Sequence, residues 1–136
     1  MLTSLLYVST SLIEPERAES RVAEIVRHAE LRNAEHGLTG ALLFTGSHFA
    51  QVFEGEEQDV DALLACLCKD SRHSGLMVVD RRPLAERRFA DWRMAYSGPS
   101  QFVARQVNRV LNDPSPSEMQ RAADWLISLF CEFAGQ

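Results

Sequence analysis

The sequence predicts an α+β fold, in which two helices cover one face of a βαββαββ sheet and two C-terminal helices cover the other. Three observations support this prediction. The chain has 136 residues, about the length of one domain. Short β-prone runs alternate with longer runs of helical period. Both faces of the expected central strands are apolar, so both faces need a cover.

The first half of the chain has the pattern of a strand, a helix and a hairpin. Leu2–Ser9 is apolar and β-prone, which predicts a strand. Glu16–Glu35 carries an apolar stripe at helical spacing, and Gly37 is the expected stop beyond it. The turn pair Gly46-Ser47 then joins two more β-prone runs into a hairpin. Its arms are Leu38–Thr45 and His48–Glu54.

A second helix and two more strands follow the hairpin. Gln58–Lys69 has an apolar stripe at helical spacing, and Pro83 separates the expected strands Gly75–Arg81 and Phe89–Tyr96. The first six elements then have the order of the ferredoxin-like unit, in which two helices cover one face of the sheet.

The C-terminal part predicts two further helices, at Gln101–Asn112 and Pro116–Phe133. The second begins at a capping-box pattern, Ser115-Pro116-Ser117-Glu118, with proline at the first helical position. This segment is too short to form its own core. We therefore expect a domain at 1–97 and a two-helix extension at 98–136 that packs on the free sheet face.

Composition excludes several classes of protein. Apolar residues make up 46% and charged residues 24%, which is ordinary for a globular domain. The net charge of -5 makes a nucleic-acid partner unlikely. No apolar run is long enough for a membrane span, and the N-terminus lacks the pattern of a signal peptide. The three cysteines have no metal or redox spacing, so we expect reduced thiols and a cytoplasmic location.

Several polar residues fall where the pattern calls for apolar ones. Gln51 lies between two phenylalanines on one strand face, and Asn33 continues the apolar stripe of the first helix. Tyr7 is core-sized, but its hydroxyl needs a partner. Each alone is typical of ordinary packing. Together they predict a cleft between helices and sheet that suits a flat aromatic ligand with polar edges. Its further candidate lining residues are Ile25, Leu67, Trp92 and Met94.

Charged residues cluster at two places. One cluster is Asp70-Ser71-Arg72-His73, directly after the second helix. It has two interpretations: an ordinary solvated helix end, or a phosphate-binding group at the mouth of the cleft. The acidic residues of Glu54–Asp61 lie mostly at a helix start, where the helix dipole favours them, so we expect no metal site.

Catalytic signatures are missing from the sequence. It contains no Gly-x-Ser-x-Gly, no His-Glu-x-x-His and no Walker loop, so we expect that the chain is not an enzyme. An acylphosphatase-like activity fits the fold, but Arg32-Asn33 at a helix end matches its arginine and asparagine only superficially. A plain ligand-binding module is a further alternative. RNA recognition is a weaker one, because no paired aromatic residues mark an exposed sheet face.

Five segments in register resemble the BLUF domain family of flavin-binding blue-light sensors, in its short stand-alone form. The resemblance extends from Leu2 to about Tyr96. The matching segments are Leu6-Tyr7-Val8-Ser9, Arg32-Asn33 with Gly37–Leu43, Phe49-Ala50-Gln51-Val52-Phe53-Glu54-Gly55, Asp70-Ser71-Arg72-His73 and Arg88-Phe89-Ala90-Asp91-Trp92-Arg93-Met94.

The resemblance implies a non-covalent flavin, usually FAD, although the sequence does not discriminate it from FMN. Tyr7 corresponds to the photoactive tyrosine and Gln51 to the switching glutamine. Asn33 corresponds to the asparagine that binds the flavin ring, and Ile25 and Leu67 would sandwich that ring. Positions near the ring edge, ribityl chain or phosphate are Arg32, Asp70, Arg72 and His73. Positions around the glutamine are Ser9, Trp92 and Met94.

The implied function is a blue-light photoreceptor for signal transduction. In the photochemistry that the resemblance implies, Tyr7 would supply an electron and a proton, and Gln51 would change its hydrogen bonding to the flavin. The signal would pass to a downstream protein effector that the sequence does not identify, and the sequence does not determine whether the chain forms a homo-oligomer.

Overall fold

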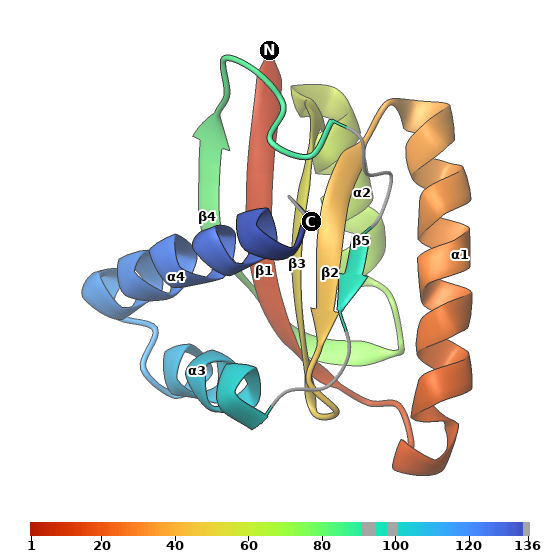
Figure 1. Ribbon diagram of the computed structural model, residues 1–136, viewed down its shortest axis with the longest axis vertical. Helices are drawn as coiled ribbons and strands as arrows, with labels where there is room; N and C mark the ends of the chain where they lie inside the picture. The colour runs from red at the N-terminus through yellow and green to blue at the C-terminus, as the bar shows by residue number, and fades with distance from the viewer. Residues whose placement is uncertain (91–94, 98–100, 135–136) are drawn as a thin grey trace.

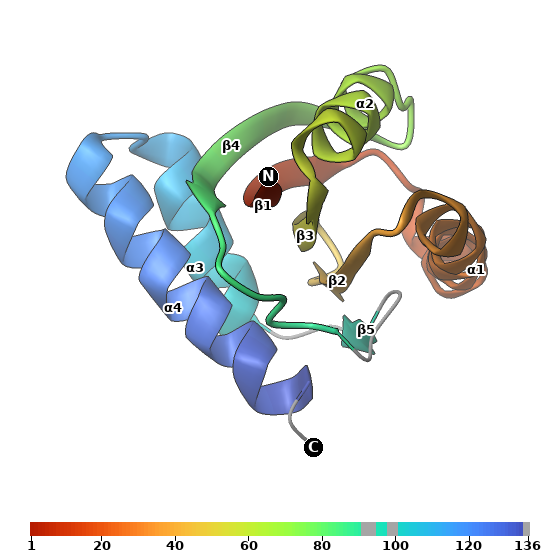
Figure 2. The same ribbon diagram turned by 90° about the horizontal axis from the view of Figure 1, so that it is seen from above.

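A single sheet lies between two layers of helices in the computed structural model (Figures 1 and 2). The structure describes residues 1–90, 95–97 and 101–134. Trp92 and Met94 lie outside these described residues. The elements are β1 (Leu2–Ser11), η1 (Pro15–Arg17), α1 (Ala18–His36), β2 (Thr39–Phe44), β3 (His48–Glu56), α2 (Glu57–Cys68), β4 (His73–Pro83), β5 (Ala95–Ser97), α3 (Gln101–Asn112) and α4 (Pro116–Ala134).

The strand order of the sheet is β4-β1-β3-β2-β5. β1 pairs antiparallel with both β3 and β4, β2 pairs antiparallel with β3, and β5 pairs parallel with β2. The first four strands therefore have the ferredoxin-like arrangement, which confirms the predicted fold class. β1 and β3 lie at the centre of the sheet, so their side chains supply most of both buried faces.

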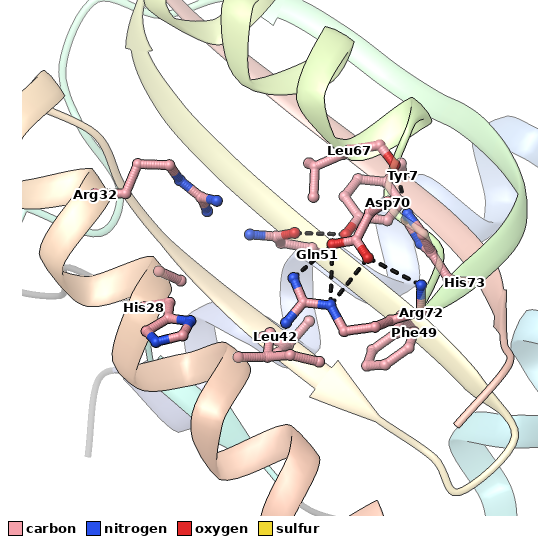
Figure 3. Close-up of a pocket in the computed structure, with 12 residues that line it drawn as sticks. Tyr7, His28, Arg32, Leu42, Phe49, Gln51, Leu67, Asp70, Arg72 and His73 are labelled. Carbon is pink, nitrogen blue, oxygen red and sulfur yellow. Dashed lines mark hydrogen bonds and ion pairs between the residues drawn. The ribbon is translucent and has the colours of Figure 1, made fainter. Parts of the chain in front are cut away.

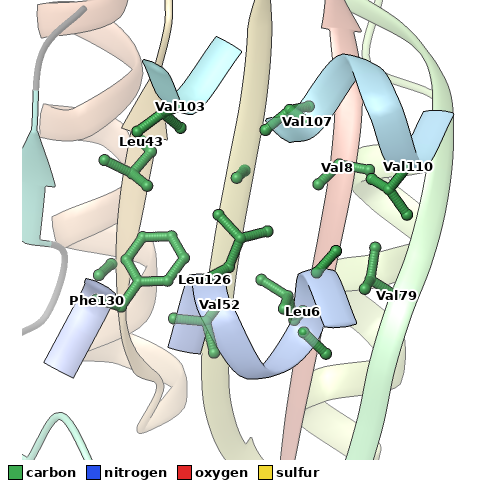
Figure 4. Close-up of a cluster of buried hydrophobic side chains, with 14 of the residues drawn as sticks. Leu6, Val8, Leu43, Val52, Val79, Val103, Val107, Val110, Leu126 and Phe130 are labelled. Carbon is green, nitrogen blue, oxygen red and sulfur yellow. The ribbon is translucent and has the colours of Figure 1, made fainter. Parts of the chain in front are cut away.

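Alternate residues of the two central strands face opposite helical layers. Leu5, Tyr7 and Phe53 belong to the cluster beneath α2, while Phe49 packs with residues of α1. On the other face, α3 and α4 pack over the sheet (Figure 4). This buried cluster includes Leu6, Val8, Ala50, Val52, Val107, Leu126 and Phe130. The prediction that the C-terminal helices cover the second sheet face is therefore confirmed.

Helix and strand ends follow from local chemistry. Gly37 ends α1 in the left-handed conformation, with φ of 66°, as the glycine stop predicted. β4 extends to Pro83, further than expected, because it is an edge strand and proline costs little where no ladder donor is needed. β3 likewise continues past Gly55 to Glu56.

The expected strand Phe89–Tyr96 is wrong at its start. Phe89 lies in a bend and Ala90 in a turn, and the described residues of this strand are Ala95–Ser97. The Phe89 ring is fully buried and meets Phe130 of α4 edge to face, with ring centroids 6.5 Å apart. The apolar residue that suggested a strand thus packs under a helix instead.

Among the described helices, none is long and apolar enough to cross a membrane.

Candidate functional site

A pocket lies between α1, the end of α2 and the sheet (Figure 3). It is built where the cleft was expected, on the sheet face opposite α3 and α4. Its lining residues are Tyr7, Ile25, His28, Ala29, Arg32, Leu42, Phe49, Gln51, Leu67, Asp70, Arg72 and His73.

The floor of the pocket is one row of the sheet. Gln51 of β3 lies directly between Leu42 of β2 and Tyr7 of β1 in the strand register. The Tyr7 hydroxyl donates a hydrogen bond of 2.6 Å to Gln51 Oε1. Because that oxygen accepts from Tyr7, the amide nitrogen of Gln51 points the other way, toward Arg32 (Figure 3). Gln51 therefore presents a donor to any ligand in the pocket.

The phenol of Tyr7 is strongly held in its protonated form. Burial raises its pKa far above the ordinary value, and the nearby Asp70 carboxylate raises it further. The guanidinium groups of Arg32 and Arg72 act in the opposite direction but do not outweigh burial. Tyr7 thus keeps its proton and its role as donor to Gln51 at neutral pH.

One face of α1 forms a wall of the pocket. Ile25, His28, Ala29 and Arg32 lie at positions i, i+3, i+4 and i+7, which is one stripe of a helix. Burial lowers the pKa of the Arg32 guanidinium. Arg32 Nε is itself buried and has no hydrogen-bond partner among the described residues. A buried donor without a partner is costly, so a ligand acceptor at this point would relieve that cost.

The segment after α2 forms the opposite wall. Leu67 projects from α2 into the pocket (Figure 3). Arg72 binds Asp70 through two guanidinium nitrogens, at 2.9 Å from Nε to Oδ1 and 2.6 Å from Nη2 to Oδ2. This hydrogen bonding lowers the pKa of Asp70 and raises that of Arg72, so both stay charged at neutral pH. The pair places fixed charges at the pocket's edge.

His73 is bound on both ring nitrogens by the protein itself. Nε2 lies 2.7 Å from the carbonyl oxygen of Leu67, which can only accept, so Nε2 carries a proton. Nδ1 lies 2.7 Å from the hydroxyl of Ser9. The ring meets Tyr7 and Phe49 edge to face, at centroid distances of 5.9 and 6.1 Å. His73 therefore fixes the start of β4 against α2 and presents its ring to the pocket.

The structure brings most of the predicted site residues together. Tyr7, Gln51, Ile25, Arg32, Leu67, Asp70, Arg72 and His73 line the pocket. Ser9 is buried behind His73, and Asn33 is fully buried on α1 beside Arg32. Four lining residues were not predicted: His28 and Ala29, which the α1 stripe implies, and Phe49 and Leu42, which neighbour Gln51 along and across the strands. No metal-binding cluster occurs among the described residues.

Comparison with known proteins identifies the family. A family model described as sensors of blue light using FAD, the BLUF model, matches residues 2–95. The chain belongs to the BLUF family. The matched region contains the whole pocket floor and both of its walls.

Relatives of this BLUF chain include light-regulated proteins. The beta subunit of the photoactivated adenylate cyclase of Euglena longa is 38% identical over 93 residues, which are 68% of this chain. The blue light- and temperature-regulated antirepressor BluF of Escherichia coli (strain K12) is 39% identical over 77 residues, or 57% of this chain. The matched segments are only 11% and 19% of those two proteins.

Solved BLUF structures have the same architecture. The dark-state structure of BlrB, a BLUF protein, aligns with a TM-score of 0.71 and 31% identity, over 90% of this chain and 94% of that one. The structure of BlsA in its photo-activated state aligns with a TM-score of 0.78, over 96% and 95% of the two chains. At 22% identity, this second likeness shows the fold alone.

The residues of the pocket fit a flavin. Ile25 and Leu67 line facing walls from α1 and α2, where a flat ring needs apolar contacts. The amide nitrogen of Gln51 and the buried Nε of Arg32 supply donors, which a flavin ring with its carbonyl and ring-nitrogen acceptors can use. The chemistry of this BLUF pocket therefore matches the cofactor of its family.

Proposed function

We propose that the chain is a blue-light photoreceptor that holds FAD non-covalently in the pocket and signals through Tyr7 and Gln51. The observation that carries the proposal is the buried hydrogen bond of 2.6 Å from the Tyr7 hydroxyl to Gln51 Oε1, on the floor of a pocket that fits a flavin. FAD is preferred over FMN because the family description names it.

The proposed binding roles are those that the family resemblance implies, and the positions of most of these residues support them. Ile25 and Leu67 would sandwich the ring and Arg32 would bind its polar edge, roles that their positions in the pocket lining support. For Asn33, which is fully buried beside Arg32 and does not line the pocket, the role at the ring edge is proposed from the family resemblance. Arg72, which Asp70 holds in place, would bind the ribityl chain or the phosphates. His73 contributes through its ring, because its two nitrogens already bind Leu67 and Ser9.

A bound flavin supplies an oxidant that blue light activates. Tyr7 gives up an electron, and its hydroxyl proton moves toward Gln51 Oε1 along the existing hydrogen bond. When the electron and proton return, the Gln51 amide is left with a rearranged set of hydrogen bonds. No substrate is turned over, so the output is a shift between two states of the protein.

Only an amide at position 51 can perform this exchange. Glutamine has a donor and an acceptor on one planar group, whereas a glutamate carboxylate only accepts and leucine does neither. Ser9, Trp92 and Met94 are proposed to tune the surroundings of Gln51. For Ser9, its hydrogen bond to His73, whose ring contacts Tyr7, supports this role.

The proposed sensor domain is 1–97, and the extension 98–136 passes the signal to a downstream protein. The packing of α3 and α4 on Ala50 and Val52, which flank Gln51, supports this route. We propose no cyclase or other enzymatic activity for this chain, because the Euglena match covers only 11% of that protein. Nothing observed favours the acylphosphatase alternative, since Arg32 lies in the helix α1 and not in a phosphate-binding loop.

The test is the colour and light response of the purified protein. Acid should release an intact chromophore that co-migrates with FAD in chromatography, since the binding is non-covalent. Blue light should shift the bound-flavin absorption to longer wavelength and darkness should restore it, because only hydrogen bonding to the ring changes. Release of FMN would correct the cofactor alone. A colourless protein that FAD and FMN both fail to reconstitute would contradict the proposal.

A further inference from the structure

Glu54 is a fully buried carboxylate on the same strand as the switching glutamine. It lies three residues after Gln51 and faces the opposite side of the sheet, toward α3 and α4. Its Oε1 accepts hydrogen bonds from the Thr39 hydroxyl at 2.9 Å and from the backbone N–H of Phe89 at 2.7 Å. Its Oε2 accepts from the backbone N–H of Arg88 at 3.0 Å. Burial of a carboxylate is costly without such bonds, so these interactions hold the loop firmly.

The loop of residues 87–89 is fixed to three neighbouring strands. Thr39, Glu54 and Ser4 lie directly across from one another in β2, β3 and β1. Arg87 Nη1 donates to the Thr39 hydroxyl at 2.9 Å and to the backbone oxygen of Glu54 at 3.1 Å. Arg88 Nη2 donates to the hydroxyl of Ser4 at 2.5 Å. The loop therefore follows the position of the sheet, and of β3 in particular.

The same loop contacts the C-terminal helices. Phe89 carries the second of the two hydrogen-bonded amides, and its side chain is fully buried. Its ring lies edge to face with Phe130 of α4, at a centroid distance of 6.5 Å. Phe130 also packs over the sheet beside Leu43 and Val52 (Figure 4). A continuous set of contacts therefore leads from β3 through Glu54 and Phe89 to α4.

We propose that Glu54 is a positioning residue that couples a light-driven shift of β3 to α4 through the loop 87–89. The inference rests on the proposed function, because the shift begins at Gln51. Gln51 and Glu54 are only about 10 Å apart along a rigid, paired strand, so a displacement of the strand carries both. The carboxylate is required because two successive backbone amides each need an acceptor, and only a carboxylate offers two acceptor oxygens.

The experiment compares Glu54→Gln with a matched control, Thr39→Val, in the full chain reconstituted with FAD. Glu54→Gln keeps the size of the side chain but replaces one acceptor by a donor, so one loop amide loses its partner. Thr39→Val removes a hydrogen bond to the same carboxylate and the bond from Arg87 to the Thr39 hydroxyl. It keeps both loop amide bonds and the bond from Arg87 to the backbone oxygen of Glu54. Amide hydrogen exchange is measured in darkness and under blue light, together with the flavin absorption.

In the wild-type protein, light should change amide exchange in residues 116–132 of α4. In Glu54→Gln, exchange in residues 87–90 should rise by about tenfold, and the light-dependent difference in α4 should disappear. The flavin red shift should remain, because the pocket lies on the other face of the sheet. Thr39→Val should keep the light-dependent difference.

Three results would overturn the role of Glu54. One is a light-dependent difference in α4 that persists in Glu54→Gln. A second is faster amide exchange in Glu54→Gln in both light and dark, with the light-dependent difference in α4 unchanged. A purely structural role of Glu54 would give this result. A third is a wild-type protein that shows the red shift without any change in α4. Absence of flavin binding or of the red shift in wild type contradicts the proposed function itself, and so is distinguishable.

A second variant covers the case in which Glu54→Gln does not fold. Phe89→Leu keeps both backbone bonds to Glu54 and removes the aromatic contact with Phe130. It should also lose the light-dependent difference in α4 and keep the red shift. If the difference persists in Phe89→Leu, the route through the loop is wrong.

Discussion

Tyr7 and Gln51 form a hydrogen bond with each other on the floor of the pocket. Both are almost completely buried, and the phenol donates while the amide oxygen accepts. This hydrogen bond holds Gln51 Oε1 toward Tyr7, so the amide nitrogen of Gln51 faces the pocket. The proton on Tyr7 therefore sets the orientation of the Gln51 amide.

Replacement of Tyr7 by phenylalanine should abolish the reversible red shift and leave flavin bound. The variant lacks the proton and the readily lost electron of the phenol, but keeps a ring of the same shape. It should lower the free energy of unfolding by about 1–2 kcal/mol, since the buried Gln51 oxygen loses its donor. Flavin content, light-minus-dark absorption and thermal unfolding measure the three effects. A Tyr7→Phe variant with a wild-type photocycle would refute the role of this hydroxyl.

The raised pKa of Tyr7 predicts a response to alkali. The pKa of Tyr7 is higher in the folded protein than its unfolded value of 10.0. Its contribution to the free energy of unfolding is therefore complete below about pH 10 and is lost as the pH rises further. Because Tyr7 stays protonated, its ionisation should not change the amplitude of the light response between about pH 6 and about pH 9. Stability should fall only above about pH 10. Tyrosinate absorption and thermal unfolding across this range provide the measurement, and ionisation of Tyr7 at neutral pH would contradict it.

Replacement of Arg32 by methionine should weaken flavin binding by about tenfold without abolishing the red shift. The substitution removes a buried donor that has no partner among the described residues, so the apoprotein should lose little stability. Arg27→Met is the matched control, because Arg27 is exposed on the same helix and does not line the pocket. Titration of each apoprotein variant with flavin measures the two affinities. Equal affinities in the two variants would exclude a direct role for Arg32.

The helices and strands could be predicted from the sequence where the periodicity of apolar residues alone determines the element. The α1 stripe, the Gly37 stop and the alternation in β3 gave the helix, its end and the two faces of the sheet. Phe89 was misassigned because an apolar residue after a loop has the same pattern whether it enters a strand or fills a gap under a helix. The internal bonding of His73 was equally hidden, since its partners Ser9 and Leu67 come from other elements.

Leu126 of α4 should contribute strongly to the contact between the C-terminal helices and the sheet. It is almost fully buried in the cluster with Leu6 and Val52. Leu126→Ala should lower the free energy of unfolding by about 2–5 kcal/mol, through lost burial and the cavity left behind. Leu129→Ala, at a partly buried position on the same helix, should cost clearly less. Chemical denaturation measures both, and equal costs would show that α4 does not pack as described.

In the whole molecule, the sheet separates the pocket from the C-terminal helices. Removal of residues 101–136 should expose the apolar face around Leu6, Val8 and Val52, and so cause aggregation or a changed oligomeric state. The part that stays in solution should still bind flavin and respond to light, because its pocket is intact. Size-exclusion chromatography and absorption test this. Loss of flavin from a folded, monomeric truncated protein would show that the two faces are not independent.

The alternation of side chains along β3 also limits how this sequence can change in evolution. Odd-numbered Phe49, Gln51 and Phe53 face the layer of α1, α2 and the pocket. Even-numbered Ala50 and Val52 pack against α3 and α4, and Glu54 binds the loop 87–89. A one-residue insertion or deletion within the strand would exchange these two sets and place an amide among the aliphatic side chains of α4. Substitutions can therefore adapt one face to a new effector while the other keeps its light chemistry, but a change in strand length alters both at once.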